Sequence, residues 1–123
     1  PLLQVKFLIE LFTKLKEENI HTCIDTSGMV GLTNDIKQLL SLTDLVLLDI
    51  KHIDPIKCKD LVGFSNEIEL DFAKYLSDNN ISMWIRQVLI PGLTDNEIDL
   101  LKLKDFIHLF FYLLLCTCHV HSF

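Results

Sequence analysis

Leu45-Val46-Leu47-Leu48-Asp49-Ile50-Lys51-His52 is an apolar run that ends in a carboxylate and an amine. An apolar run without a polar face is typical of a strand buried on both sides, as in a parallel sheet covered by helices. Charged residues that follow such a strand lie where open sheets and barrels bind their ligands. Taken alone, Asp49 and Lys51 are better explained as a solvated strand end, since such ends are common on loops. The remaining strands must decide between the two interpretations.

Alternating strand and helix patterns surround this stretch. We predict strands near residues 20–25, 45–50 and 81–90, and helices over 2–18, 34–42, 55–61, 66–78 and 95–106. The order αβαβααβα predicts an α/β fold in which the strands pair in parallel. Because three strands leave two unpaired edges, we expect the middle part of a larger open sheet or of a partial (β/α) barrel.

Local signals place the ends of these elements. Candidate helix N-caps are Thr33 or Asn34, Asp54 before Pro55, Ser65 or Asn66, and Thr94 or Asp95. Glu69 shares a helical spacing with Phe72, Ala73 and Leu76 on the fourth helix. The third strand ends at Pro91-Gly92.

Composition excludes several classes of protein. The 123-residue chain carries 17 acidic and 11 basic residues, a net charge of -6, which argues against binding nucleic acid. It has no signal-peptide pattern and no apolar run of about 18 residues that would span a bilayer. Four scattered cysteines do not form a disulfide framework. We therefore expect a cytoplasmic protein.

The charged residues all lie at or before Asp105. We accordingly divide the chain into residues 1–107 and an uncharged, divergent tail over 108–123, of the kind that a truncated or frame-shifted gene model produces. Since the first residue is proline, we also expect the chain to begin inside a longer sequence.

Polar residues recur where the predicted strands end. The first strand ends in Asp25-Thr26, the second in Asp49 and Lys51, and the third carries Arg86. Parallel strands end at one rim, so these groups should converge into a ligand site. Carboxylates and a hydroxyl suit a small cation, and a lysine suits a carboxylate or phosphate. Arg86 remains open between a ligand contact and an ion pair with a neighbouring acid.

Longer segments carry a family resemblance with the spacing kept from about Pro1 to Ile107. These segments are His21-Thr22-Cys23-Ile24-Asp25-Thr26-Ser27-Gly28, residues 43–54, Leu61-Val62-Gly63-Phe64-Ser65-Asn66, Phe72-Ala73-Lys74-Tyr75-Leu76 and residues 83–95. They resemble the pyruvate formate-lyase activating enzymes, radical S-adenosylmethionine enzymes that activate glycyl-radical enzymes.

The resemblance implies a partial (β/α)6 barrel with a 4Fe–4S cluster at which S-adenosylmethionine is cleaved reductively. A hydrogen is then abstracted from a glycine of the partner, most simply pyruvate formate-lyase, with flavodoxin or ferredoxin as electron donor. The positions that the resemblance assigns are Asp49, Ile50 and Lys51 for S-adenosylmethionine, Asp25, Thr26, the carbonyl of Leu47 and Asp49 for a monovalent cation, and Arg86 for the partner's glycine loop. It assigns no catalytic residue within this chain.

The chain also departs from the family pattern. The three-cysteine motif C-x3-C-x2-C is absent, and we expect it upstream of Pro1. The family's later Pro-Tyr-His segment, whose histidine contacts S-adenosylmethionine, has no counterpart after Ile107. We therefore predict that the chain alone is inactive. An alternative is a non-catalytic α/β segment that binds a partner or a small ligand.

Other cysteines and histidines are weaker candidates. Residues 116–121, Cys-Thr-Cys-His-Val-His, offer soft metal ligands but lack the paired spacing of known structural sites. We expect Cys23 and Cys58 to be small core or semi-exposed thiols. For His52 we prefer a solvated loop histidine to the alternative that it lines the rim. Residues 109–115 are too short to span a membrane.

Overall fold

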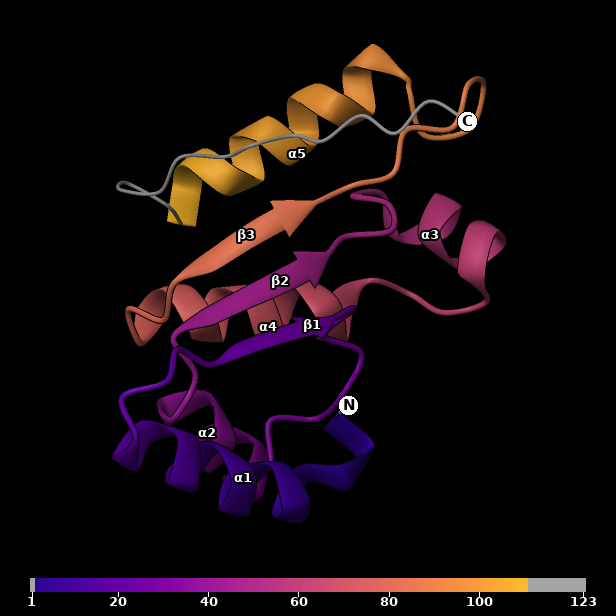
Figure 1. The fold of residues 1–123 in the computed structure, drawn as a ribbon. Helices are drawn as coiled ribbons and strands as arrows, with labels where there is room; N and C mark the ends of the chain where they lie inside the picture. Colours follow the sequence, from indigo (N-terminus) through magenta and orange to yellow (C-terminus); the bar gives the residue numbers. More distant parts are fainter. Residues whose placement is uncertain (1, 111–123) are drawn as a thin grey trace.

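The computed structural model describes residues 2–110 and contains a three-stranded parallel sheet (Figure 1). The strands are β1 (Cys23–Thr26), β2 (Leu45–Asp49) and β3 (Met83–Arg86), in the spatial order β1-β2-β3. The helices are η1 (Leu2–Gln4), α1 (Val5–Glu17), α2 (Asn34–Ser41), α3 (Pro55–Val62), α4 (Glu67–Asp78) and α5 (Glu97–Phe110). The predicted order of elements is confirmed, although β1 and β3 are shorter than expected. The predictions for residues 111–123 lie outside the described part.

Among residues 2–110, helices cover only one face of the sheet (Figure 1). Along β2 the side chains alternate, with Val46 and Leu48 fully buried while Leu45, Leu47 and Asp49 are half-buried. The prediction that this strand is buried on both faces is therefore wrong. Cys23, expected to be a small core or semi-exposed thiol, lies on the open face and is exposed. The open face is the one that carries Asp49 toward solvent.

Four helices build the core against the covered face. Figure 1 shows α4 behind β2, with α1 and α2 beyond β1 and α5 beyond β3. Phe72, Ala73 and Leu76 of α4 are fully buried against the strands. Burying side chains of the size of Phe72 and Leu76 contributes roughly 1.5–3 kcal/mol each. The helical spacing predicted for α4 is thus confirmed.

Most helix ends follow the sequence signals. Asp54 caps α3 by accepting the N–H groups of Ile56 and Lys57, and Gly63 ends this helix with a φ of 85°. Thr33 caps α2. The cap predicted for α5 is wrong, because Asn96 accepts the N–H groups at the start of that helix. Thr94 instead bonds within its own loop.

Asp44 joins the amino ends of β1 and β2. Its carboxylate accepts the backbone N–H of Thr22 at 2.8 Å and pairs with Lys16 of α1. The Thr22 hydroxyl also bonds Asp44, at 3.0 Å, and donates to the carbonyl of Leu42 at 2.7 Å. Bonding to Lys16 and Thr22 holds the pKa of Asp44 well below its usual range.

Replacing Asp44 with asparagine should lower the melting temperature at pH 7. A carboxyl whose pKa is lower in the folded state stabilises the fold above its ordinary value of 3.8, and that stability is lost as the pH falls below it. The difference in melting temperature between Asp44→Asn and the natural chain should therefore become smaller below pH 4. Thermal unfolding followed by circular dichroism measures this difference. Asp71→Asn on the exposed face of α4 is the control. A gap that is independent of pH would contradict the role given to the charge of Asp44.

None of the helices within residues 2–110 is long and apolar enough to cross a membrane.

Candidate functional site

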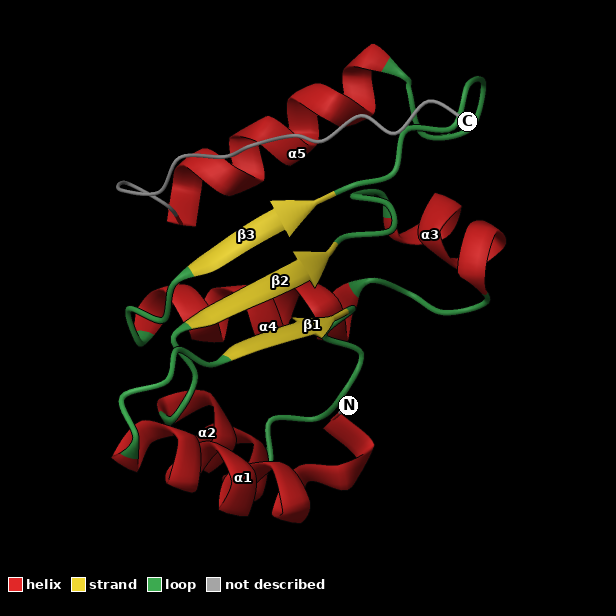
Figure 2. Ribbon diagram, in the orientation of Figure 1, coloured by secondary structure: helices red, strands yellow, loops and turns green. Residues whose placement is uncertain are grey.

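The three strands bring polar side chains to one rim. Figure 2 shows the strand arrowheads on the same side of the sheet, where loops leave toward the helices. In the register of the sheet, Asp49 pairs with Arg86, and Asp25 pairs with Leu47 two residues earlier on β2. Because paired residues of parallel strands share a face, Asp25, Asp49 and Arg86 lie on the open face together.

Arg86 bridges the two aspartates. Its Nη2 lies 2.6 Å from Asp25 Oδ1, and its Nε lies 2.7 Å from Asp49 Oδ1. The other oxygen of Asp49 is 3.3 Å from Lys51 Nζ. Partial burial lowers the pKa of Arg86, but hydrogen bonds to both aspartates outweigh it and raise the pKa overall. The rim therefore holds two carboxylates around a positive charge, with a second cation beside them.

The other predicted positions differ in what they can offer. Thr26 pairs with the buried Leu48, on the opposite face from Asp25, and its hydroxyl accepts the Gly28 N–H at 3.1 Å. The side chain of Ile50 is fully buried in the core. Ile50 could therefore contact a rim ligand only through its backbone.

The rim suits a ligand that carries both signs of charge. Lys51 offers an ammonium group with a side chain that is 37% exposed, and Asp25 offers a carboxylate that is 58% exposed. The amino-acid part of a molecule such as S-adenosylmethionine has complementary groups. The residues present fit that part of the molecule.

The described cysteines do not suit an iron–sulfur cluster. Cys23 is exposed on β1, whereas Cys58 is buried in α3. Desolvation, which is only partial at Cys23, raises the pKa of both thiols, and the nearby carboxylates of Asp25 and Glu69 respectively raise the pKa further. Among residues 2–110, no three His, Cys, Asp or Glu side chains gather in a way that could hold a metal ion.

Two side chains at the start of α4, Glu69 and Asn66, bond the backbone of residues 51–53. The sequence alone did not predict these contacts. The backbone N–H of Lys51 donates to Glu69 Oε1 at 3.2 Å. The side chain of Asn66 donates to the carbonyls of His52 and Ile53, at 2.9 and 2.7 Å. The helical spacing of Glu69 indicated that it faces inward, but nothing in the sequence pointed to its partner.

His52 is buried, so the prediction of a solvated loop histidine is wrong. It is 1% exposed, and its Nδ1 accepts the N–H of Asp54 at 3.0 Å. Its Nε2 lies 3.7 Å from the buried Asp99, which also pairs with Lys57. The hydrogen bond to Lys57 lowers the pKa of Asp99, so the Lys57–Asp99 pair stays charged.

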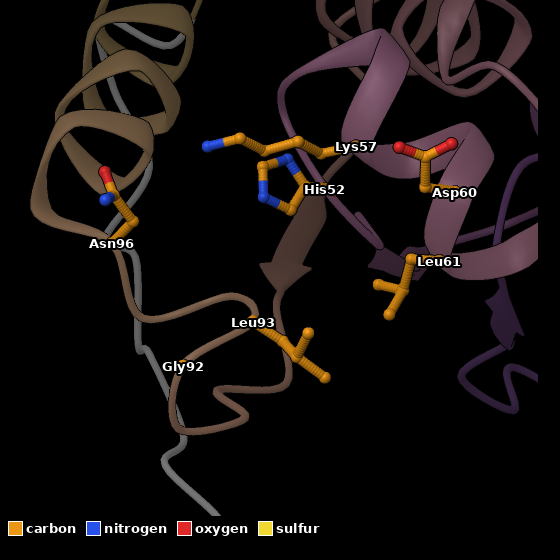
Figure 3. A pocket seen from close by; sticks show the side chains of 7 residues that line it. All are labelled: His52, Lys57, Asp60, Leu61, Gly92, Leu93 and Asn96. Carbon is orange, nitrogen blue, oxygen red and sulfur yellow. The ribbon is translucent and has the colours of Figure 1, made fainter.

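A cavity of about 370 Å³ opens beside His52 (Figure 3). Figure 3 shows the imidazole next to Lys57, with Leu61 of α3 and Leu93 of the β3–α5 loop further along the wall. The ammonium group of Lys57 is already paired with Asp99. We assign no ligand to this cavity.

Comparison with known proteins gives consistent findings. The family model described as the Radical SAM superfamily matches residues 1–103. Pyruvate formate-lyase-activating enzymes of Staphylococcus aureus strains USA300 and N315 are each 50% identical over 115 residues, covering 88% of this chain. The chain spans 45% of the length of these relatives.

Solved structures share the fold. A domain of pyruvate-formate lyase-activating enzyme from Bacteroides vulgatus matches with a TM-score of 0.79 at 23% identity, over 87% of this chain and 66% of that one. SuiB of Streptococcus suis, in a crystal with S-adenosylmethionine, matches with a TM-score of 0.66 at 19% identity, over 80% of this chain and 23% of that one. At these identities the likeness concerns the fold alone. The predicted partial-barrel architecture is confirmed.

Proposed function

Because this chain belongs to the radical SAM superfamily, we propose that it supplies the ligand-binding rim of an enzyme that activates a glycyl-radical enzyme. The named relatives at 50% identity support pyruvate formate-lyase as the partner. The observation that carries the proposal is the convergence of Asp25, Asp49, Lys51 and Arg86 at the carboxyl ends of three parallel strands.

In this proposal each rim residue has a distinct role. The ammonium group of Lys51 holds the carboxylate of S-adenosylmethionine, beside Asp49 and the backbone of Ile50. Asp49 positions Lys51, since its Oδ2 lies 3.3 Å from that ammonium group. When bound, S-adenosylmethionine supplies the hydrogen-abstracting chemistry typical of the family.

A monovalent cation belongs to the same proposal. Asp25, Thr26, the carbonyl of Leu47 and Asp49 would hold it beside the ligand carboxylate. The position between the two aspartates already binds a positive charge, the guanidinium of Arg86. A cation there would release Arg86 to face the glycine loop of the partner.

The reducing half of the reaction requires groups outside residues 2–110. We propose that the ligands of a 4Fe–4S cluster come from a C-x3-C-x2-C segment upstream in the gene, and that flavodoxin or ferredoxin reduces the cluster. Finding unrelated sequence at that place would favour the alternative of a non-catalytic α/β segment.

Replacing Lys51 with alanine should weaken the binding of S-adenosylmethionine by about tenfold or more. A hydrogen bond to a charged group contributes about 1.5–3 kcal/mol, and about 1.4 kcal/mol corresponds to a factor of ten. Affinity is measured by titrating the ¹⁵N-labelled chain with S-adenosylmethionine and following backbone amide shifts. Lys59→Ala, on the exposed side of α3, is the matched control. Equal affinities for Lys51→Ala and the natural chain would rule out the proposed contact.

A further inference from the structure

Glu69 is a fully buried carboxyl group directly behind the rim. It lies in the first turn of α4 and is 0% exposed. Its Oε1 accepts the backbone N–H of Lys51 at 3.2 Å, while its buried Oε2 has no hydrogen-bond partner. A buried carboxyl with one orphaned oxygen is costly, so its presence here calls for a physical reason.

The neighbouring Asn66 contacts the same segment. Asn66 stands at the N-cap position of α4, yet its side chain makes no cap bond to its own helix. Its Nδ2 donates instead to the carbonyls of His52 and Ile53. The start of α4 thus holds three consecutive residues, one by its N–H and two by their carbonyls.

The sheet itself does not orient this segment. The last backbone bond from β2 to β3 joins the N–H of Ile50 to the carbonyl of Arg86 at 2.9 Å. Lys51 follows, beyond the last paired positions of β2, and its N–H donates to Glu69. Glu69 therefore holds the backbone N–H of Lys51 where the strand pairing has ended.

We propose that Glu69 is a positioning residue that fixes the Lys51 backbone, so that the Lys51 ammonium group and Asp49 meet the ligand in a set geometry. This inference rests on the proposed function, because it concerns the same contact with S-adenosylmethionine. Glu69 touches neither the ligand nor the reacting atoms and acts only through Lys51.

The electrostatic surroundings make the contact observable. Burial raises the pKa of Glu69 to about 7. The hydrogen bond from the Lys51 N–H and the positive charge of Lys51 lower this pKa, whereas the negative charge of Asp49 raises it. Cys58 faces Glu69 from α3, and its thiol remains protonated because burial and the Glu69 carboxylate raise its pKa. Glu69 therefore changes charge near neutral pH while bonded to one identifiable amide.

The first test is the amide proton of Lys51 in the ¹⁵N-labelled chain. Its resonance should move downfield with a midpoint near pH 7, because ionisation of Glu69 strengthens the hydrogen bond that it accepts. In Glu69→Gln the same resonance should stay constant over this range. A Lys51 amide that behaves identically in both proteins would overturn the inference, and this measurement does not require that any disruptive variant folds.

The second test separates positioning from general stability. Glu69→Ala removes the acceptor and should weaken binding of S-adenosylmethionine by up to about tenfold, the most that the net contribution of one typical hydrogen bond corresponds to. Glu69→Gln keeps an acceptor oxygen and should restore affinity to within about threefold of the natural chain. Equal binding by Glu69→Ala and the natural chain would overturn the inference. If Lys51→Ala also bound normally, the proposed function itself would fail, and the two failures are thereby distinguished.

Discussion

Replacing Gly28 with alanine should lower the free energy of unfolding by about 2–5 kcal/mol. Gly28 has a φ of +69°, and a Cβ there would lie 2.9 Å from Leu48 Cδ1 and 3.2 Å from the ring of Phe72. Leu48 and Phe72 are both fully buried, so one of these side chains must shift within the core to admit the Cβ. Left-handed backbone strain costs about 1–2 kcal/mol and overpacking about 1–3 kcal/mol, and both apply at this position.

Two other glycines separate these causes. Gly63 also has a positive φ, +85°, but a Cβ there would meet nothing within 4 Å. Gly63→Ala should therefore show the backbone cost alone, about 1–2 kcal/mol. Gly31 has open space and no positive φ, so Gly31→Ala should change stability by less than about 1 kcal/mol. Urea unfolding followed by the fluorescence of Trp84 measures all three. Equal losses of unfolding free energy for Gly28→Ala and Gly63→Ala would show that the side chains of Leu48 and Phe72 shift to make room for the Cβ without a measurable cost.

The order and pairing of the strands were predictable because local patterns specify them. Apolar runs, helical spacings and turn residues each depend on a few adjacent positions. The faces of the sheet were not predictable in the same way. Leu45 and Leu47 are as apolar as Val46 and Leu48, so composition alone does not distinguish the open face of β2 from the covered one. Only the placement of the helices does.

The rim was predictable in outline. Parallel strands share their carboxyl ends, which is why Asp25, Asp49 and Arg86 were expected together, and the structure brings them together. The sequence alone did not predict which acids pair with Arg86, because the two ion pairs join residues that are 61 and 37 positions apart. A role for Arg86 toward a partner stays a prediction.

Buried polar groups were the hardest to foresee. His52 follows a strand, where a histidine is usually solvated, and it is buried because Asp99 of α5 and the Asp54 N–H lie against it. Glu69 had the spacing of the buried stripe of α4, so its inward direction was indicated. The hydrogen-bond partner of Glu69 could not be predicted from the sequence, because it is a backbone N–H, a group that every residue except proline possesses.

Glu69→Gln should make the stability of the chain less dependent on pH. The pKa of Glu69 is about 7 in the folded chain, against an ordinary value of 4.5, because burial disfavours the carboxylate. Between these values the folded state keeps a proton that the unfolded state has released, so stability falls as the pH rises and the loss is complete above pH 7. Since one pKa unit corresponds to about 1.4 kcal/mol, the natural chain should lose up to about 3 kcal/mol that Glu69→Gln does not lose.

Urea unfolding at pH 5 and at pH 8 measures this difference, and the quantity that matters is the change between the two pH values. Glu67→Gln is the matched control, because it makes the same substitution in the same helical turn at an exposed position. Glu67→Gln should follow the natural chain at both pH values. If Glu69→Gln also follows the natural chain at both pH values, Glu69 is ionised throughout this range and burial does not raise its pKa. If Glu69→Gln gains stability at pH 8 while the Lys51 amide is unresponsive to pH, the carboxyl is only a buried acid. The positioning role requires both responses, because one proton on one carboxyl must account for them: the Lys51 amide shift has its midpoint near pH 7, and the loss of stability levels off above that pH.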